Sequence, residues 1–298
     1  MHPPLDDSSV TLAGRSGALA RPWLAGLVPV LWFGALLLTI YATVLSRLAE
    51  QWMVNEDMSH GFLVPLFAGY VAWQRWPKLL AAPSQPTLWG LPVMLLAALF
   101  LLVAPPGAGT WSFLSRLSFL LAILGVVLFT RGVPTLRLLA YPLILLVLMI
   151  PIPGFLYSKI TLPLQLLASQ LGEALIEGAG YSVFRQGNLL HMVGITLSVE
   201  EACSGLRSLL SLSFLGQAYV YLFDPRVWMR WVMALAIIPI AIFANAIRIL
   251  STAILGRIDP ALTHGGVHAS SAWILFACSF AALIALHLVI NRIVPVRR

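Results

Sequence analysis

Long apolar runs, separated by short polar or proline-containing segments, make up most of this chain. A transmembrane helix needs roughly 20 mostly apolar residues, and eight runs approach or reach that length. They cover about residues 23–45, 61–76, 88–104, 111–130, 136–150, 206–223, 228–255 and 271–290. The pattern predicts an all-α polytopic membrane protein with about eight transmembrane helices.

Residues 155–205 interrupt this pattern. Residues 160–176 have apolar positions at helical spacing, but four polar residues interrupt or follow them: Gln165, Gln170, Glu173 and Glu177. Such a segment is typical of an interfacial or re-entrant helix rather than a span. The alternation after Gly194 favours a short hairpin or extended strands outside the bilayer. We therefore expect one membrane domain, 23–291, with an outer-face insertion at about 155–205.

The composition agrees with a membrane protein. The 298 residues are 60% hydrophobic and 10% charged, whereas soluble proteins carry about 25% charged residues. The polar tail before residue 23 has no signal-peptide pattern, so we expect the first span to be an uncleaved anchor. The net charge is +7, but the sequence has no basic soluble domain that would bind nucleic acid.

The basic residues predict an orientation. If the N-terminus is cytoplasmic, the inner segments hold 11 of the 18 basic residues and only three acids. This distribution obeys the positive-inside rule. It assigns the tails, 1–22 and 292–298, to the cytoplasm, and it assigns Cys203, Arg248 and His268 to the outer face.

A cluster of ionisable residues stands at the start of the sixth run. Its members are Glu200, Glu201, Cys203 and Arg207. Such groups are costly close to hydrocarbon, so the cluster is a functional-site hypothesis. If Leu206 opens a helix, Cys203 lies near a helix N-terminus, where the macrodipole favours the thiolate. The two carboxylates oppose a thiolate, and we predict that Arg207 or Arg248 contacts at least one of them.

Arg248 lies within the apolar seventh run, where an arginine is expensive to insert. One interpretation is that it snorkels to the interface or pairs with a glutamate. Asn245 lies one turn away on the same helix face, which favours a functional role instead.

His268 falls in an expected outer loop, before the eighth run. A loop histidine is often only a solvated surface residue, but with a cysteine on the same side it becomes a candidate general acid or base. His264 is a competitor for this role. We interpret His191 and His287 as structural, and Cys278 as a small buried hydrophobe.

Ser59 and His60 precede the second run. A capping role at the helix start is favoured over a substrate-facing role. The sequence has no paired spacing of metal ligands, so no metal or other cofactor is expected. The Cys, Arg and His on three separate segments are compatible with thiol acyl-transfer chemistry. The alternative function is a transporter or a scaffold for exopolysaccharide or lipid export, although transporters usually show internal repeats, which are not evident here.

Four stretches together resemble the exosortase/archaeosortase family of membrane transpeptidases. They are residues 59–65 (SHGFLVP), 201–206 (EACSGL), 245–249 (NAIRI), and His268 with Ser271 and Trp273. Their order and spacing agree from about residue 23 to 291. Ala272 departs from the pattern, since the family favours glycine there.

The resemblance implies a thiol protease or transpeptidase (EC 3.4.22 type) of the PEP-CTERM sorting system in the bacterial inner membrane. Its active site would face the periplasm, with Cys203 as nucleophile and Arg248 and His268 as its partners. Glu200, Glu201, Ser204, Gly205, Arg207, Asn245, Ser59 and His60 would then be substrate-binding or supporting residues. The implied partners are secreted proteins with a C-terminal signal, made of a short motif, a transmembrane helix and a basic tail, and an envelope acceptor.

Overall fold

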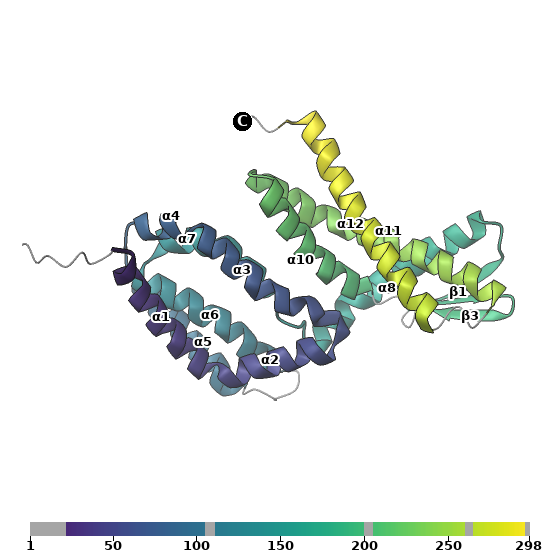
Figure 1. The fold of residues 1–298 in the computed structure, drawn as a ribbon. Helices are drawn as coiled ribbons and strands as arrows, with labels where there is room; N and C mark the ends of the chain where they lie inside the picture. The colour runs from purple at the N-terminus through teal and green to yellow at the C-terminus, as the bar shows by residue number, and fades with distance from the viewer. Residues whose placement is uncertain (1–21, 105–110, 200–204, 260–264, 296–298) are drawn as a thin grey trace, which may run out of the picture.

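The computed structural model describes residues 22–104, 111–199, 205–259 and 265–295. These residues are mostly helical, and Figure 1 shows them in two groups, α1 to α7 on one side and α8 to α12 with a small sheet on the other. The first group comprises α1 (Pro22–Ile40), α2 (Ala42–Val54), the 3-10 helix η1 (Glu56–Phe62), α3 (Leu63–Gln74), α4 (Trp76–Ala81), α5 (Gly90–Val103), α6 (Ser112–Thr130) and α7 (Val133–Val147).

The second group is built around one long helix. It comprises α8 (Gly154–Gly178), β1 (Val183–Gln186), β2 (Leu189–Met192), β3 (Ile195–Ser198), α10 (Gly205–Phe223), α11 (Val227–Ile258) and α12 (Gly265–Ile293). Helix α11 packs against α8, α10 and α12. Leu212, Met233 and Leu283 form part of a buried core shared by α10, α11 and α12.

The segment between the fifth and sixth runs contains the predicted helix and the predicted extended strands. Residues 160–176 are helical within α8, and the strands form an antiparallel sheet in the order β1-β2-β3. His191 pairs with Phe184 on one side and with Thr196 on the other. The opposite face of the sheet buries Leu190 and Leu197 against Ile176 of α8 and Ile249 of α11. The hairpin prediction is therefore confirmed and extended by a third strand.

The prediction of eight spans is not confirmed. Each predicted run is helical, but in the described residues only three helices are long and apolar enough to cross a membrane: 112–130, 227–258 and 270–293. Helix α5 has 14 residues, which at about 1.5 Å per residue is shorter than a hydrocarbon core of roughly 30 Å. The first run divides into α1 and α2, which meet at 72° and would count as a fourth span if the bent pair crosses as one.

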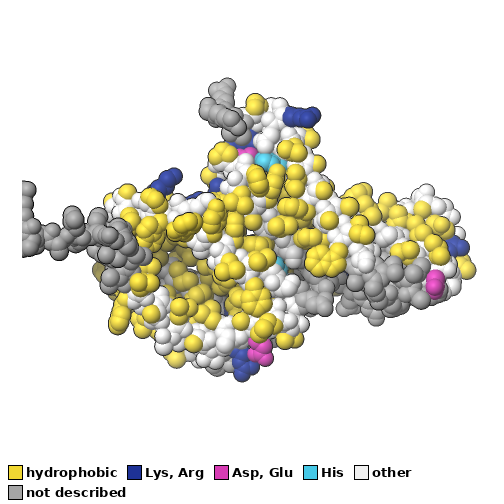
Figure 2. Space-filling view, viewed as in Figure 1, with side chains coloured by type: hydrophobic (Ala, Val, Ile, Leu, Met, Phe, Trp, Pro, Cys, Tyr) yellow, Lys and Arg dark blue, Asp and Glu magenta, His cyan; other side chains and the backbone are white. Residues whose placement is uncertain are grey.

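Much of the surface is apolar, as expected for a protein surrounded by lipid. Leu66, Trp73, Leu95, Leu235 and Trp273 are each about two thirds or more exposed. Figure 2 shows hydrophobic side chains over both helical groups, with only a few charged residues on this face. Contiguous exposed apolar surface of this kind is rare on soluble monomers, so the surface supports the assignment to a membrane.

Candidate functional site

Arg248 and Asn245 lie one turn apart on α11, as the sequence predicted. Both side chains are partly buried. The backbone around them is held firmly, because Ala246 and Ile249 are buried at 0% and 1% exposure. Ser251 donates a hydrogen bond from Oγ to the carbonyl of Arg248 at 2.8 Å. The helix therefore presents these two polar side chains from a rigid position.

The two side chains line a cavity between three helices. This cavity is partly open to the surroundings. The other lining residues are Leu212 of α10, Ala241 and Ala244 of α11, and Ala272, Leu275, Phe276 and Ser279 of α12. Since most of this lining is apolar or small, the guanidinium and the amide are the chief polar features of the cavity.

Two of the helices that border the cavity, α10 and α12, are close in sequence to the other two candidate residues, Cys203 and His268. Position 268 lies on α12 one turn before Ala272, and residues four apart share a helix face. Gly205, the first residue of α10, lies seven positions before Leu212 and so on the same face. Cys203 precedes Gly205 by two residues in the sequence.

The prediction that His268 lies in a loop is wrong. Helix α12 begins at Gly265, so position 268 belongs to its first turn. No proline lies between residues 265 and 293 to prevent this extension, and α12 gains packing against α11 and α10. A helical position restricts the direction that position 268 faces far more than a loop would.

Several predicted residues fall outside the described part of the chain. Glu200, Glu201, Cys203, Ser204 and His264 are not described, and for Arg207 and His268 only the helical backbone is described. The predicted contact between a glutamate and Arg207 or Arg248 therefore stays a prediction.

Ser59 and His60 do not cap α3. Helix α3 follows Phe62, and no side chain forms a cap hydrogen bond there. His60 is 6% exposed, with Nε2 3.3 Å from the carbonyl oxygen of Leu148 and Nδ1 3.4 Å from Oγ of Ser211. It therefore joins η1 to the end of α7 and to α10, while Ser59 is exposed.

Cys278 is exposed on α12, so its interpretation as a buried hydrophobe is wrong. Its neighbour Ser279 is the buried residue that faces the cavity. The apolar run gives no indication of which face of α12 packs inward, because both faces carry apolar residues.

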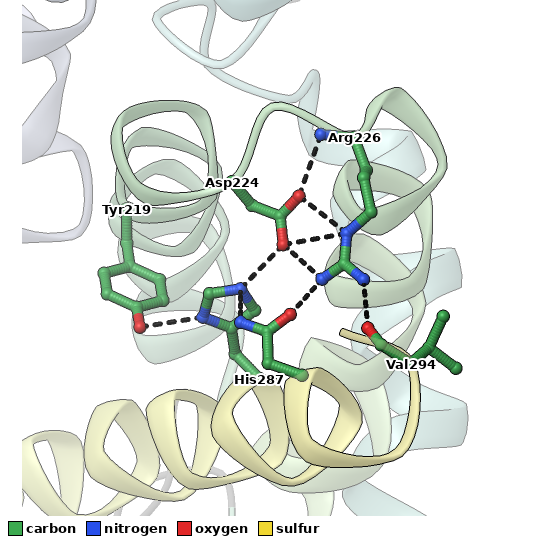
Figure 3. Close-up of polar contacts among 6 residues, drawn as sticks. Tyr219, Asp224, Arg226, His287 and Val294 are labelled. Carbon is green, nitrogen blue, oxygen red and sulfur yellow. Dashed lines mark hydrogen bonds and ion pairs between the residues drawn. The ribbon is translucent and has the colours of Figure 1, made fainter. Parts of the chain in front are cut away.

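The sequence also missed a buried polar network at the far end of the bundle (Figure 3). Asp224, 1% exposed, accepts hydrogen bonds from the backbone N–H of Arg226 at 2.8 Å and from its Nη2 at 2.5 Å. Nε2 of His287 lies 2.9 Å from Oδ2 of Asp224, and Nδ1 lies 2.9 Å from the Tyr219 hydroxyl. The structural interpretation of His287 is confirmed. The signal in the sequence was an acid, Asp224, followed two residues later by Arg226.

Burial and hydrogen bonding compete at Asp224. Desolvation by burial acts to raise its pKa, but the hydrogen bonds from Arg226 and His287 together outweigh it. The net result is a pKa of about 2. Asp224 is therefore an ionised carboxylate at neutral pH, and in the same pair the pKa of Arg226 is raised by its hydrogen bond to Asp224.

Within the described residues, no group of three or more His, Cys, Asp or Glu side chains is arranged to hold a metal ion. The fold and the cavity instead define a class: a helical membrane protein with an arginine and an asparagine in a mostly apolar cavity between three helices. The chain belongs to the transmembrane exosortase family, whose model matches residues 52–285. The match includes Cys203, Arg248 and His268. No curated protein and no solved structure matches the chain.

Proposed function

We propose that this exosortase is a membrane cysteine transpeptidase that cleaves the C-terminal sorting signal of secreted proteins and transfers them to an envelope acceptor. The observation that carries the proposal is the cavity around Arg248. It is lined by α10, which Cys203 closely precedes, and by α12, whose first turn contains position 268.

In the first step, Sγ of Cys203 attacks the scissile carbonyl carbon while His268 accepts the thiol proton. The tetrahedral intermediate collapses when His268 returns this proton to the leaving amine, so the peptide bond breaks and a thioester remains on Cys203. The released fragment is the transmembrane helix with its basic tail.

In the second step, a nucleophile on the acceptor attacks the thioester carbonyl. If the nucleophile is an amine, an amide forms, its extra proton passes through His268, and the Cys203 thiol is regenerated. If water enters instead, the product is a free carboxylate and the enzyme acts as a protease.

Arg248 suits a role in stabilising negative charge. Stabilisation of a developing negative charge by a guanidinium is stronger in a low-dielectric cavity than in water. The same charge would favour either the oxyanion or the Cys203 thiolate. Asn245, one turn away, supplies an amide that is able to hydrogen-bond the substrate backbone.

The substrate's C-terminal helix would lie in the bilayer beside the bundle, with its motif at the periplasmic face. This arrangement follows from the positive-inside orientation, with both termini in the cytoplasm. A basic tail on the substrate would then lie in the cytoplasm, on the same side as the basic segments of the enzyme.

The test is processing of a tripartite substrate in cells. Cys203→Ala is expected to abolish release of the C-terminal fragment, whereas Cys278→Ser, which removes the exposed cysteine on α12, should leave release unchanged. Full processing in Cys203→Ala cells would exclude the proposal.

One observation favours a transporter as a second candidate. The bend of 72° between α1 and α2 resembles the broken helices of transporters. However, this bend lies in the first helical group, whereas Arg248 and its cavity lie in the second. Substrate flux through reconstituted protein that is insensitive to thiol alkylation would favour the transporter.

A further inference from the structure

Arg75 and Arg230 lie beside the same pair of tyrosine rings, at the end of the bundle that also contains Arg226. The rings of Tyr141 on α7 and Tyr221 on α10 stack with centroids 5.1 Å apart. The guanidinium carbon of Arg230 lies 4.5 Å from the centre of the Tyr141 ring and 4.7 Å from that of Tyr221. The guanidinium carbon of Arg75 lies 5.7 Å from the centre of the Tyr221 ring. Both positive charges therefore lie within 6 Å of the centre of the Tyr221 ring.

No carboxylate in the described residues neutralises these two charges. The acidic side chains that are described are Glu50, Glu173, Glu177, Asp224 and Asp259. Of these, only Asp224 lies at this end, and it is bonded to Arg226 and His287. Arg226 is paired with an acid, Asp224. Arg75 and Arg230 have no such partner among the described acids.

The hydrogen bonds of the two guanidinium groups are also incomplete. Nη1 of Arg75 donates to the carbonyl of Leu138 at 2.6 Å, which uses one of its five N–H donors. Nε of Arg230 is buried and has no hydrogen-bond partner within the described residues. Both side chains are only partly exposed, so bulk water does not fully replace the missing acceptors. An arginine that simply snorkelled would extend into water instead.

Tryptophans mark the depth of this cluster. Trp73, Trp228 and Trp231 are exposed by 70%, 44% and 63%, and each lies within three residues of one of the arginines at this end of the bundle. Exposed tryptophans gather at the membrane–water interface. The exposed tryptophans beside Arg75 and Arg230 therefore indicate that this cluster lies near the membrane–water interface.

We propose that Arg75 and Arg230 form a binding site for a phosphate-bearing anion, with the headgroup phosphate of an anionic phospholipid as its expected source. Guanidinium groups bind phosphate oxygens through paired N–H donors, and both guanidinium groups lie beside the same Tyr221 ring. The site is separate from the candidate active site, because Arg230 and Arg248 are 18 residues apart on α11, or roughly 27 Å along the helix.

The site also joins the two helical groups. Arg75 and Tyr141 belong to the first group, whereas Tyr221 and Arg230 belong to the second. The Tyr141 hydroxyl donates to the carbonyl of Gln217 at 2.9 Å, and Nε2 of Gln217 donates to the carbonyl of Arg230 at 3.0 Å. An anion bound to both arginines would reduce their mutual repulsion, so it would stabilise this junction.

The proposal is tested by thermal unfolding of the purified full chain in a neutral detergent. Phosphatidylglycerol, phosphatidylcholine or inorganic phosphate is added in separate titrations. We expect phosphatidylglycerol to raise the Tm and phosphatidylcholine to have little effect. Arg75→Gln and Arg230→Gln should reduce the rise to less than half. The matched control is Arg137→Gln, an exposed arginine at the start of α7, which should keep the full rise.

Inorganic phosphate distinguishes the two sources of the anion. If it raises the Tm of the wild-type chain as much as phosphatidylglycerol, and both arginine variants lose that rise, the site stands and its ligand is a soluble phosphate. If Arg230→Gln does not fold, Arg75→Gln and Arg230→Lys carry the test, and both should show a reduced rise. Equal rises in the wild-type chain and every foldable arginine variant, or equal rises with both lipids, would overturn the proposal.

Discussion

Nε2 of His287 lies 2.9 Å from Oδ2 of Asp224, with both residues at most 2% exposed. The contact joins the last part of α12 to the loop between α10 and α11. Nδ1 of His287 lies 2.9 Å from the Tyr219 hydroxyl, and Nε2 also lies 2.9 Å from Nδ2 of Asn291. Because α12 also contains position 268, this network anchors one end of a helix whose other end belongs to the candidate active site.

The first prediction concerns this anchor. Asp224→Ala would leave His287 and Arg226 without their buried acceptor, so we expect a loss of about 3–5 kcal/mol in the free energy of unfolding. Tyr219→Phe removes only the hydrogen bond between the Tyr219 hydroxyl and His287, so it should cost about 1 kcal/mol. Denaturant unfolding in detergent measures both, with the exposed Glu50→Gln as control. A loss below 1 kcal/mol in Asp224→Ala would contradict the anchoring role.

The second prediction concerns acid. The pKa of Asp224 is lowered from 3.8 to about 2, so its contribution to stability is fully present above pH 4. It is lost as the pH falls from about 4 to about 2, since the unfolded chain takes up a proton more readily than the folded one. The loss should be roughly 2 kcal/mol. When the free energy of unfolding is measured from pH 6 to pH 2, Asp224→Asn should lack this pH-dependent loss. Identical pH profiles for the wild-type chain and Asp224→Asn would contradict the prediction.

The third prediction tests the packing beneath Arg248. A Cβ at Gly172 of α8 would lie 2.8 Å from Cγ2 of Ile249, which is 1% exposed and follows Arg248 directly. Gly172→Ala should therefore cost about 1–3 kcal/mol through overpacking, and it should slow substrate processing by displacing α11.

The matched control is Gly178→Ala at the end of the same helix. A Cβ at Gly178 would meet nothing within 4 Å, so both stability and processing should stay close to those of the wild-type chain. If the two variants behave alike, the close contact between α8 and α11 does not position Arg248.

The fourth prediction concerns Arg248 itself. If its guanidinium stabilises charge that develops during acyl transfer, Arg248→Gln should slow processing by about 10²–10³-fold. Arg248→Lys keeps the charge but loses the planar fork, so it should retain intermediate activity. Pulse-chase measurement of fragment release gives the rates, and Asn245→Ala provides a neighbouring variant that leaves the charge in place. Equal rates for Arg248→Gln and the wild-type chain would remove Arg248 from the chemistry.

The helices were largely predictable from the sequence, but their breaks were not. Apolar runs located α6 and α10 to within one residue and α11 to within three. The bend between α1 and α2 falls at Tyr41, where no proline or glycine marks it. Tyr41 is 3% exposed, its hydroxyl accepts a hydrogen bond from Ser118, and its ring contacts Phe119. Contacts with α6, far away in the sequence, accompany this bend, and hydropathy carries no information about them.

The candidate site was predictable in its residues more than in its geometry. Asn245 and Arg248 stood out because polar side chains are costly in an apolar run, and the structure brings both to one cavity. The role of Ser279 in lining this cavity was not predicted, because serine is common in membrane helices. The partnership of Asp224 with His287 joins residues 63 positions apart, and a single sequence gives no sign of such a long-range pair.

The central claim is that Cys203 forms a covalent acyl intermediate. The most direct measurement is mass spectrometry of the wild-type chain co-expressed with a tripartite substrate and trapped in acid, where thioesters persist. The proposal predicts a hydroxylamine-sensitive adduct on the peptide that contains Cys203, with a mass equal to the substrate up to its cleavage site. This adduct should be absent from Cys203→Ala and retained in Cys278→Ser. Cleaved substrate without any adduct on Cys203, or an adduct on another residue, would contradict the claim.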